Sequence, residues 1–388
     1  MSAIDAAARR SPDIVPVRAS SDSPAPRPIV DIGLVHDYLL TARGAERTFS
    51  AMAGCWPEAP IYTALFDREQ MGDRFARRRV VTSGLQKLGV GQRSFRALLP
   101  LFPGAIERLP VGEHDVVVSS SSAFAHGVHP GADAVHVSYC HSPFRYVWHE
   151  RDRTIRQMPA AARPLARRVL GRVRRWDLAA TDRVTHFVAN SEITRERIFG
   201  CYGREAAVIH PPVDVERFGA PQRPQGYLLY VGEITAHKRV ETAIEAARLA
   251  GRQIKVVGDG PERRRLATLH AGHAEFVGRI PDRELTDLFA RADALIVPNV
   301  EEFGIAAVEA QAAGRPVVGI ARGGTRETVI DGVTGVLVDT GTVEEFAEAL
   351  RATDFSRFDG ADIAMYAKRF SIARFQRELR DLVAGCAA

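Results

Sequence analysis

Two glutamates, Glu301 and Glu309, stand eight positions apart in the stretch of this chain that is richest in chemistry. From about Gly304 onward apolar residues recur at helical spacing, and Gly314 followed by a proline ends that pattern. The first glutamate therefore lies on the loop that enters a helix, and the second lies inside the helix. Carboxylates at these two places suit the hydroxyls of a sugar or a ribose. A buried helix with a solvated glutamate at each end has the same local pattern, so the neighbouring motifs must decide.

The start of this expected helix also suits an anion. The backbone amides near Ile305 and Ala306 belong to the first turn, so they have no intrahelical partner and carry partial positive charge. Phe303 and Gly304 directly precede them. A ligand with a phosphate for these amides and hydroxyl groups for the two carboxylates would be a sugar nucleotide. The pattern therefore predicts a site for that class of ligand.

A loop with two adjacent cations, Lys238 and Arg239, follows the expected strand 227–231. The loop begins at Gly232 and resembles a phosphate-binding loop, but no Ser or Thr follows the lysine, so it is not a Walker A motif. Two cations at the start of a helix suit a diphosphate, because each charge-assisted contact contributes roughly 1.5–3 kcal/mol.

A second strand–turn–helix junction, at residues 256–261, contains Gly258. It begins like a dinucleotide fingerprint, but Arg263 stands where the third glycine belongs, which argues against a dehydrogenase. The chain also lacks the G-x-S-x-G elbow of many hydrolases and the D-x-D motif that holds a metal-bridged sugar nucleotide. We therefore predict no metal and no tightly bound cofactor.

In the N-terminal half, two loops that follow expected strands carry further candidates. Gly44 precedes a helix start, where a small residue lets a phosphate or sugar approach the backbone. His141 follows the expected strand 134–139, and Pro143 fixes the turn after it. A histidine in this position is placed to face a cleft, so we predict a role in the site for His141. A purely structural histidine gives the same local sequence.

The elements that must position these residues alternate between short apolar strands and helices. This alternation predicts an α/β fold whose parallel sheets are covered on both faces. It runs in two series separated by a proline-rich crossing, so we expect two Rossmann-like domains with the ligand loops at the carboxyl ends of the strands, facing across a cleft. The expected division is a disordered tail at 1–28, an acceptor domain at 29–210, a nucleotide-sugar domain at 211–354 and a helical segment at 355–388 that packs back on the N-terminal domain.

Composition narrows the class of protein. The chain has 388 residues, enough for two cores, and its four cysteines are scattered without a C-x-x-C pair, which suits a reducing compartment. With no apolar run of about 18 residues, we expect a cytoplasmic protein. Arginines crowd the region Arg163–Arg175, where apolar residues at helical spacing predict a basic amphipathic helix. Such a helix suits an anionic membrane surface or simple packing against the protein, and no nucleic-acid motif accompanies it.

Taken together, these motifs resemble the group-1 (family 4) retaining glycosyltransferases, which have the GT-B fold. The resemblance covers nearly everything from Ile29 onward. Its most specific stretches are VGE…HKR, VVGDGPE, FVGRIPD, EEFGIAAVEAQAAGRPVVG and GGTRETVIDGVTG in the C-terminal half, with YCHSPFRYVW and IHPPVDVERF before them. The chain looks most similar to bacterial mannosyltransferases that build polysaccharide or lipid-linked repeat units.

The resemblance implies roles for individual residues. The implied catalytic residues are His141 near the reacting carbon, Lys238 at the leaving diphosphate and Glu301 at the sugar hydroxyls. Glu309 would take the ribose hydroxyls, and Arg279 with Ile280 would lie near the base. The implied donor-binding residues are Gly44, Gly232, Arg239, Gly258, Arg279, Ile280, Phe303, Gly304, Ile305, Ala306 and Glu309.

Two departures from the family pattern concern the phosphates. Glu233 stands where the family has a second cation, so Arg239 is the candidate replacement. Arg43 replaces the first of two glycines that the family often has in the first loop, and an arginine there suits an anionic acceptor instead.

The sequence thus predicts retaining transfer of a hexose, with mannose favoured, from a nucleoside-diphosphate sugar to a hydroxyl of a glycan or lipid-linked acceptor. The donor is GDP-mannose or a UDP-sugar, and the protein lies at the inner face of the cytoplasmic membrane when the Arg163–Arg175 region binds that surface. Two alternatives stay open: a catalytically inactive sugar-nucleotide-binding protein, and a UDP-sugar-dependent transferase with a small-molecule acceptor.

Overall fold

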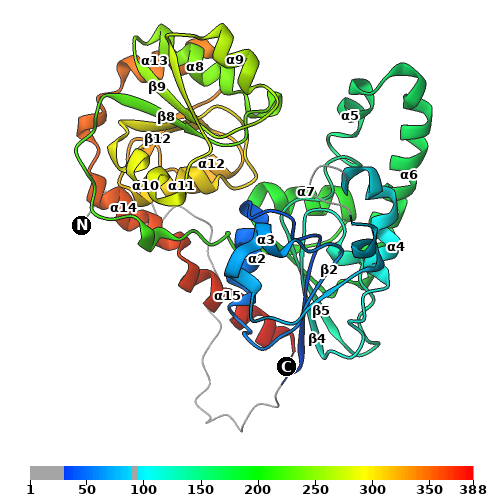
Figure 1. Ribbon diagram of the computed structural model, residues 1–388. Helices are drawn as coiled ribbons and strands as arrows, with labels where there is room; N and C mark the ends of the chain where they lie inside the picture. The colour runs from blue at the N-terminus through cyan, green and yellow to red at the C-terminus, as the bar shows by residue number, and fades with distance from the viewer. Residues whose placement is uncertain (1–29, 90–94, 388) are drawn as a thin grey trace, which may run out of the picture. The chain divides into compact units, whose positions relative to one another are not determined.

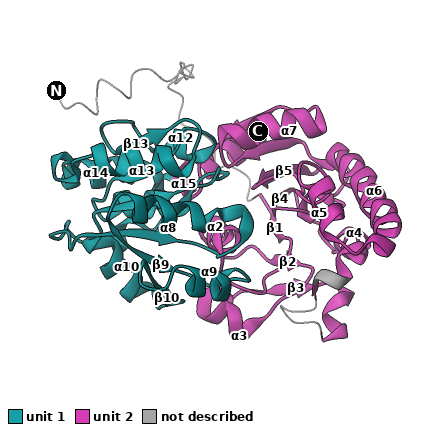
Figure 2. Ribbon diagram, turned by 90° about the horizontal axis from the view of Figure 1, so that it is seen from above, with its two compact units in different colours: residues 1–25, 212–374 teal, residues 26–211, 375–388 magenta. Residues whose placement is uncertain are grey.

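A computed structural model describes residues 30–89 and 95–387 (Figure 1). The disordered tail predicted at 1–28 lies outside the described residues. The chain divides into two compact units, which Figure 2 colours separately. Of the described residues, unit 1 contains Pro212–Arg374, and unit 2 contains those from 30 to 211 together with those from 375 to 387.

Unit 2 is built on a seven-stranded sheet in the order β3-β2-β1-β4-β5-β6-β7, with every pair of neighbours parallel. Its strands are β1 (Ile32–His36), β2 (Ile61–Thr63), β3 (Val80–Thr82), β4 (Val116–Ser121), β5 (Val135–Cys140), β6 (His186–Ala189) and β7 (Ala206–Val208). Its α-helices are α2 (Gly44–Ala53), α3 (Arg68–Met71), α4 (Phe102–Glu107), α5 (Arg151–Gln157), α6 (Arg163–Ala180), α7 (Glu192–Tyr202) and most of α15 (Ile372–Cys386). The strand order reverses between β1 and β4, the kind of switch point where open α/β sheets bind ligands.

The strands of unit 2 divide their side chains between two cores. On β4, Val116 and Val118 enter the core that contains Phe375 of α15, whereas Val117 enters the opposite core with Phe124. This division follows from the period of two along a strand. Because both faces are covered, β4 begins with three successive buried valines, and such short apolar runs are what predict the buried strands.

Unit 1 is built on a six-stranded parallel sheet in the order β10-β9-β8-β11-β12-β13. Its strands are β8 (Tyr227–Val231), β9 (Gln253–Val257), β10 (Ala274–Gly278), β11 (Ala294–Val297), β12 (Val317–Ile320) and β13 (Gly335–Val338). Its α-helices are α8 (Val240–Leu249), α9 (Arg263–Leu269), α10 (Asp282–Arg291), α11 (Ile305–Ala312), α12 (Gly324–Thr328), α13 (Val343–Ala352) and α14 (Gly360–Ala367). Helices α8, α9 and α13 lie on one side of this sheet and α10, α11 and α12 on the other (Figure 1). Here the order reverses between β8 and β11.

The C-terminal segment belongs to both units. Helix α14 lies against α11, and its Tyr366 joins the core of unit 1 together with Phe370. Further along, Phe375, Leu379 and Val383 of α15 enter a core of unit 2. The segment expected to pack back on the N-terminal domain thus has apolar residues in a core of each unit.

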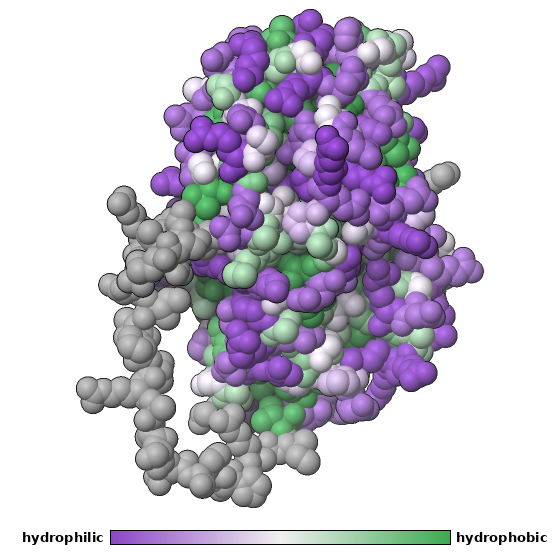
Figure 3. Space-filling view, turned by 90° about the vertical axis from the view of Figure 1, so that its left-hand side faces the viewer, coloured by the Kyte–Doolittle hydropathy of each residue, from purple (hydrophilic) through white to green (hydrophobic). Residues whose placement is uncertain are grey.

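The face drawn in Figure 3 is mostly hydrophilic, and its apolar side chains form small separate groups. Within residues 30–89 and 95–387, no helix has both the length and the apolar character that crossing a membrane requires. The apolar residues of the central strands β4, β11 and β12 are instead buried inside the two units.

Candidate active site

Two loops of unit 1 meet at the switch point of its sheet. One follows β8 and carries Lys238, and the other follows β11 and carries Glu301. Because β8 and β11 are paired neighbours, their carboxyl ends bring together two residues that are 63 positions apart in the chain. The sheet topology therefore unites two of the sequence-predicted site residues.

Lys238 and Glu301 form an ion pair at this point. The Lys238 Nζ lies 2.7 Å from each carboxylate oxygen of Glu301. Asn299 donates a further hydrogen bond to Glu301 Oε1 over 3.0 Å. The side chains of Lys238 and Glu301 are 23% and 21% exposed, so a ligand can reach both of them. A diphosphate that bound Lys238 would release Glu301 for the hydroxyls of a sugar.

The backbone of Arg239 is left-handed, and its side chain is hydrogen-bonded within the protein. Its φ of 52° is the one positive value among non-glycine residues in the part of the chain that the structure describes. A left-handed conformation disfavours an L-residue by on the order of 1–2 kcal/mol, so the surroundings must hold it. The guanidinium donates to the Gly341 carbonyl over 2.6 Å and fastens the loop after β13 to the loop after β8. Its role at a second phosphate remains a prediction.

Glycines allow the phosphate loop and the next loop to pack backbone to backbone. A Cβ on Gly258 would lie 1.9 Å from the carbonyl oxygen of Gly232, and a Cβ on Gly260 would lie 2.3 Å from that of Ile234. Gly258 also has a φ of 136°, which side chains rarely allow. A larger residue at either position would displace the loop that carries Lys238.

The start of α11 has the arrangement that the sequence predicts for an anion site. Gly304, with a φ of 90°, turns the chain into the helix and has no side chain to cap it. Its carbonyl accepts from the amides of Ala307 and Val308 over 2.9 and 3.4 Å. The amides of Ile305 and Ala306 therefore precede the hydrogen-bond ladder of the helix, and both residues are partly exposed.

The loop before α11 is anchored from two sides. The Phe303 side chain is 3% exposed and packs edge-on against Phe370, with ring centroids 5.5 Å apart. It therefore anchors the loop in the core and leaves only its backbone for the donor contact that the sequence analysis predicts. On the other side, Gly324 donates its amide to the Glu301 carbonyl over 2.8 Å, and a Cβ on Gly324 would lie 2.2 Å from the Phe303 Cα.

Glu309 is buried one turn inside α11 and is paired with an arginine that the sequence analysis did not single out. Its Oε1 accepts from Arg217 Nη2 over 2.6 Å. Arg217 lies in a short 3-10 helix, η7 (Val215–Arg217), 92 positions earlier in the chain. No local pattern connects residues so far apart, which is why this partner was missed.

Arg279 and Ile280, predicted to lie near the base, follow strand β10 at the edge of the sheet. Arg279 is exposed, whereas Ile280 packs against the core of unit 1. Their strand is separated from β8 by β9, so they lie at the margin of the cluster that Lys238 and Glu301 form.

In unit 2, His141 belongs to a chain of three polar side chains at the ends of β1, β4 and β5. The Ser120 Oγ lies 2.9 Å from His141 Nε2 and 3.1 Å from His36 Nδ1. A hydroxyl can donate to one ring nitrogen and accept from the other. Burial, with a contribution from His141, lowers the pKa of His36 to about 3, so this ring is neutral at pH 7. His141 itself is partly exposed, as a residue that meets a ligand must be.

A second buried polar cluster closes the same end of the sheet. Asp37, directly after β1, accepts from the amides of Ser122, Phe124 and Ala125 over 2.6–2.8 Å. Burial raises the pKa of the Asp37 carboxyl against the lowering effect of these amides. The aspartate thus ties the loop after β4 to the loop that leads to Gly44.

Gly44 is the first residue of α2, so the helix begins at Gly44 itself rather than directly after it. The Arg43 amide donates to Glu46 Oε2 over 3.0 Å and caps the helix. Glu46 is buried, and burial raises its pKa to about 7. The Glu46 carboxyl group in the first turn of α2 therefore holds the end of the loop that precedes this helix.

Two family models match consecutive parts of the chain. Residues 42–217 match the model described as "Glycosyltransferase Family 4", and residues 215–353 match the one described as "Glycosyl transferases group 1". The second match includes Lys238 and both glutamates, and the first includes Gly44 and His141. The chain belongs to the group-1 (family 4) glycosyltransferases. The family that the motifs predict is thereby confirmed.

Curated relatives of this glycosyltransferase match part of its length. A glycogen synthase of Mycobacterium tuberculosis (strain CDC 1551 / Oshkosh) is 37% identical over 178 residues, which are 42% of this chain and 42% of the relative. A D-inositol 3-phosphate glycosyltransferase of Kribbella flavida is 35% identical over 209 residues, which are 45% of this chain and 48% of the relative. The match thus spans less than half the length of these curated relatives.

Solved structures resemble this glycosyltransferase over nearly its whole length. Anabaena Alr3699/HepE in complex with UDP has a TM-score of 0.69 at 17% identity and covers 92% of this chain and 100% of its own. WaaG, a glycosyltransferase involved in lipopolysaccharide biosynthesis, has a TM-score of 0.66 at 18% identity, covering 91% and 100%. At this identity the likeness shows the fold. The predicted class, an α/β GT-B protein with two parallel Rossmann-like sheets, is confirmed.

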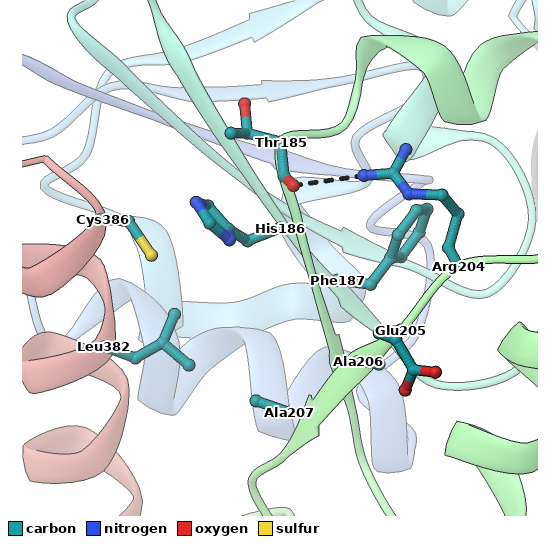
Figure 4. Close-up of a pocket in the computed structure, with 9 residues that line it drawn as sticks. All are labelled: Thr185, His186, Phe187, Arg204, Glu205, Ala206, Ala207, Leu382 and Cys386. Atoms are coloured by element: carbon teal, nitrogen blue, oxygen red, sulfur yellow. Dashed lines mark hydrogen bonds between the residues drawn. The ribbon is translucent and has the colours of Figure 1, made fainter.

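Elsewhere in this glycosyltransferase, a pocket of about 470 Å³ lies where β6 and β7 begin, between Thr185, Arg204 and Cys386 (Figure 4). It is at the amino ends of these strands, whereas the candidate site residues follow carboxyl ends. We therefore do not assign it to the reaction. In the two described ranges, no group of three or more His, Cys, Asp or Glu side chains is arranged to hold a metal ion.

The arginine-rich region of this glycosyltransferase forms α5 and α6, which project together from unit 2 (Figure 1). The predicted apolar stripe of α6 is buried in its second half, where Val173 joins the core. In its first half Leu165 is 67% exposed. Trp148, Arg151 and Arg174 line a pocket of about 400 Å³ between the two helices, and the Arg174 guanidinium lies 4.2 Å above the Trp148 ring.

Proposed function

We propose that this chain transfers a hexose from a nucleoside-diphosphate sugar to a hydroxyl of a glycan or lipid-linked acceptor, with retention of configuration. One observation carries the proposal: the switch point of unit 1 joins a cation, a helix start and a carboxylate. Lys238, the amides of Ile305 and Ala306, and Glu301 supply these three parts. Lys238 and the two amides are complementary to a diphosphate, and Glu301 is complementary to a sugar hydroxyl.

In this proposal the Lys238–Glu301 ion pair is exchanged when the donor binds. The diphosphate takes Lys238 and the amides at the start of α11, and the released Glu301 accepts hydrogen bonds from the sugar hydroxyls. Glu309, one turn further along α11, takes the ribose hydroxyls. Each charge that develops on the leaving group therefore meets a group already held in place, which is the main requirement of this chemistry.

The reaction breaks the bond between the sugar's anomeric carbon and the diphosphate oxygen. The acceptor oxygen forms the new bond on the same face of the sugar, and its proton passes to the departing diphosphate. No pair of carboxylates across the scissile bond is needed, unlike in glycosidases. His141 would contact the donor sugar near the reacting carbon, in an orientation held through Ser120.

Two donors are proposed for direct comparison. GDP-mannose follows from the resemblance to bacterial mannosyltransferases, and a UDP-hexose from similar solved structures that hold UDP or UDP-glucose. The acceptor is proposed to be lipid-linked, at the cytoplasmic face of an anionic membrane. The exposed arginines and Leu165 of α6 support this location, because they combine positive charge with an apolar side chain.

A catalytically inactive sugar-nucleotide-binding protein is the second candidate. Glu233 stands where the family has a cation, and the Arg239 guanidinium is bound to the Gly341 carbonyl. A site with reduced positive charge at the diphosphate would stabilise the leaving group less.

The test is release of nucleoside diphosphate from a panel of GDP- and UDP-sugars, with and without a membrane lipid extract, beside a Glu309→Ala variant. Release from one donor that rises with the extract and is lost in the variant would support the transferase and fix its donor. Nucleotide binding without release from any donor would favour the binding protein.

A further inference from the structure

Arg217 is the cation that faces the buried carboxylate of Glu309. Its Nη2 donates to Glu309 Oε1 over 2.6 Å, and its Nη1 lies 3.5 Å from Asp282 Oδ2. The exposed fractions of the three side chains are 15% for Arg217, 8% for Glu309 and 55% for Asp282. The short contact is therefore also the buried one, so the guanidinium serves mainly Glu309.

The position of Arg217 is fixed by its neighbours in the chain. Val215 and Phe218 are buried in the core of unit 1, on either side of the arginine. The Phe218 ring packs edge-on against Phe289, and the guanidinium lies 4.7 Å from the Phe218 centroid. An arginine held in this way has little rotamer freedom to lose when it binds a carboxylate.

A buried carboxylate needs such a partner to accept hydrogen bonds from a ligand. Burying an ion without compensation is strongly unfavourable, and a carboxyl group left alone would take up a proton or turn toward solvent. An ionised carboxylate accepts hydrogen bonds at both oxygens, whereas in a protonated carboxyl group one oxygen carries the proton and acts as a donor. Each ribose hydroxyl can donate one hydrogen bond, and such a bond is stronger when the accepting carboxylate is ionised.

We infer that Arg217 is a positioning residue for the ribose of the nucleotide: it keeps Glu309 ionised and in one orientation, so that the carboxylate accepts from the ribose hydroxyls. The inference rests on the proposed function, in which Glu309 meets the ribose. The inference extends the proposed function because it places part of the nucleotide specificity in η7, at the start of unit 1. This element is far in sequence from the motifs around α11.

The experiment compares the dissociation constants of a nucleoside diphosphate and its 2′,3′-dideoxy analogue, measured by calorimetry, in the wild type and in Arg217→Met. The wild type should bind the ribose form about 10- to 100-fold more tightly, the scale of hydrogen bonds to a charged group. In Arg217→Met this ratio should fall to about 1. The dideoxy form should bind both proteins alike.

Arg252→Met is the matched control. Arg252 also pairs with a buried aspartate, Asp293, over 3.1 Å and also lies over a phenylalanine ring, that of Phe355. Both residues precede strands, so this pair is at the amino end of the same sheet. Its loss should lower stability and leave the ribose ratio at the wild-type value.

The outcomes separate the inference from the proposed function. A wild type that binds no nucleoside diphosphate would overturn the proposed function. A wild type that distinguishes the two nucleotides while Arg217→Met keeps the same ratio would overturn the inference alone. If Arg217→Met does not fold, Arg217→Lys decides, because it keeps the charge without the planar fork and should give an intermediate ratio. An unchanged ratio in Arg217→Lys would then count against the inference.

Discussion

At the residue scale, each glutamate of the candidate donor site has a cation as a described partner, but the two pairs differ in exposure. Glu301 and Lys238 keep about a fifth of their exposure, whereas Glu309 and Arg217 keep 8% and 15%. A partly exposed ion pair contributes little to stability, so a ligand can exchange its partners at little cost. A buried pair is costly to separate and therefore acts as a fixed part of the site.

Lys238→Ala should reduce turnover of the donor by at least about 100-fold, the usual effect of removing one electrostatic stabiliser of a transition state. The physical reason is that, in the proposed site, the leaving diphosphate loses the positive charge of Lys238. Turnover is measured as nucleoside diphosphate release at saturating donor.

Lys255→Ala is the control for this change. Lys255 is also in an ion pair, with Glu275 over 3.1 Å, and has a similar exposure of 27%. It lies within β9, away from the strand ends, so turnover should be unchanged. A Lys238 variant as active as the Lys255 variant would remove Lys238 from the mechanism.

His136 should make unit 2 less stable in acid. Its ring is buried between the Ser119 hydroxyl and the Arg183 carbonyl, and burial lowers its pKa from 6.5 to about 4. Between these values the unfolded chain binds a proton that the folded one does not, so stability is lost as pH falls from 6.5 toward 4. From pH 7.5 to 5 this amounts to on the order of 2 kcal/mol, at about 1.4 kcal/mol per pKa unit.

His136→Gln should remove this contribution, because glutamine fills similar space and takes up no proton. All three tryptophans (Trp56, Trp148 and Trp176) lie in unit 2, so urea unfolding followed by their fluorescence reports on this unit. The change in unfolding free energy between pH 7.5 and pH 5 should shrink in the variant. An equal change in both proteins would show that His136 does not titrate as its burial implies.

At the element scale, glycines place the loops of the site by letting backbones touch. Gly324 beside Phe303 and Gly258 beside Gly232 leave no room for a Cβ. Gly324→Ala should therefore push the loop before α11 out of place. Overpacking of this kind destabilises by about 1–3 kcal/mol, and nucleotide affinity should fall by at least about tenfold, because the loop carries Glu301.

Gly200→Ala provides the comparison for Gly324→Ala. Gly200 lies inside α7, and a Cβ there meets no atom within 4 Å. Alanine at this helical position should leave binding unchanged and stabilise by up to about 1 kcal/mol. Calorimetric binding and thermal unfolding measure both effects. Equal nucleotide affinity in the two variants would contradict the steric role of Gly324.

The elements that position the site could largely be read from the sequence, since buried parallel strands are continuous apolar runs. Strand β8 has the expected limits, and α11 begins directly after Gly304 as expected. The three-residue strands β2, β3 and β7 were missed. They are too short to give an apolar run, and β3 and β7 lie at the edges of their sheet.

Contacts between distant parts of the chain account for what the sequence did not predict about the site. Ser120 and Arg217 are ordinary residues in their own segments, and only the fold places them against His141 and Glu309. Loop motifs predict which residues lie at strand ends, because the rule for α/β sheets is local to each strand. The partners of those residues depend on strand order, which no single segment contains.

At the scale of the whole molecule, positive charge is unevenly distributed. The net charge is only +5, yet α6 alone carries exposed Arg167, Arg168, Arg172, Arg174 and Arg175. Arg168, Arg172 and Arg175 follow the exposed Leu165 at intervals of three or four residues, so they share one side of the helix with it. Within the described residues, no carboxylate lies within ion-pair distance of these three arginines, and the phosphates of an anionic lipid surface would supply the missing negative charge.

Replacing Arg168, Arg172 and Arg175 together by glutamine should weaken binding to phosphatidylglycerol vesicles by about 100-fold, at roughly 1 kcal/mol for each arginine near an anionic surface. Sedimentation at low salt measures this binding, and 0.5 M salt should abolish it in the wild type because the contacts are screened. Vesicles of neutral lipid should bind neither protein.

The triple replacement of Arg74, Arg77 and Arg79 by glutamine separates a specific surface from net charge. These arginines are also exposed and also belong to unit 2, so the change in charge is the same. If α6 is the membrane-binding element, this variant keeps the wild-type affinity while the α6 variant loses it. Equal losses would instead mean that the vesicles respond to overall charge, and α6 would then not be a specific membrane-binding element.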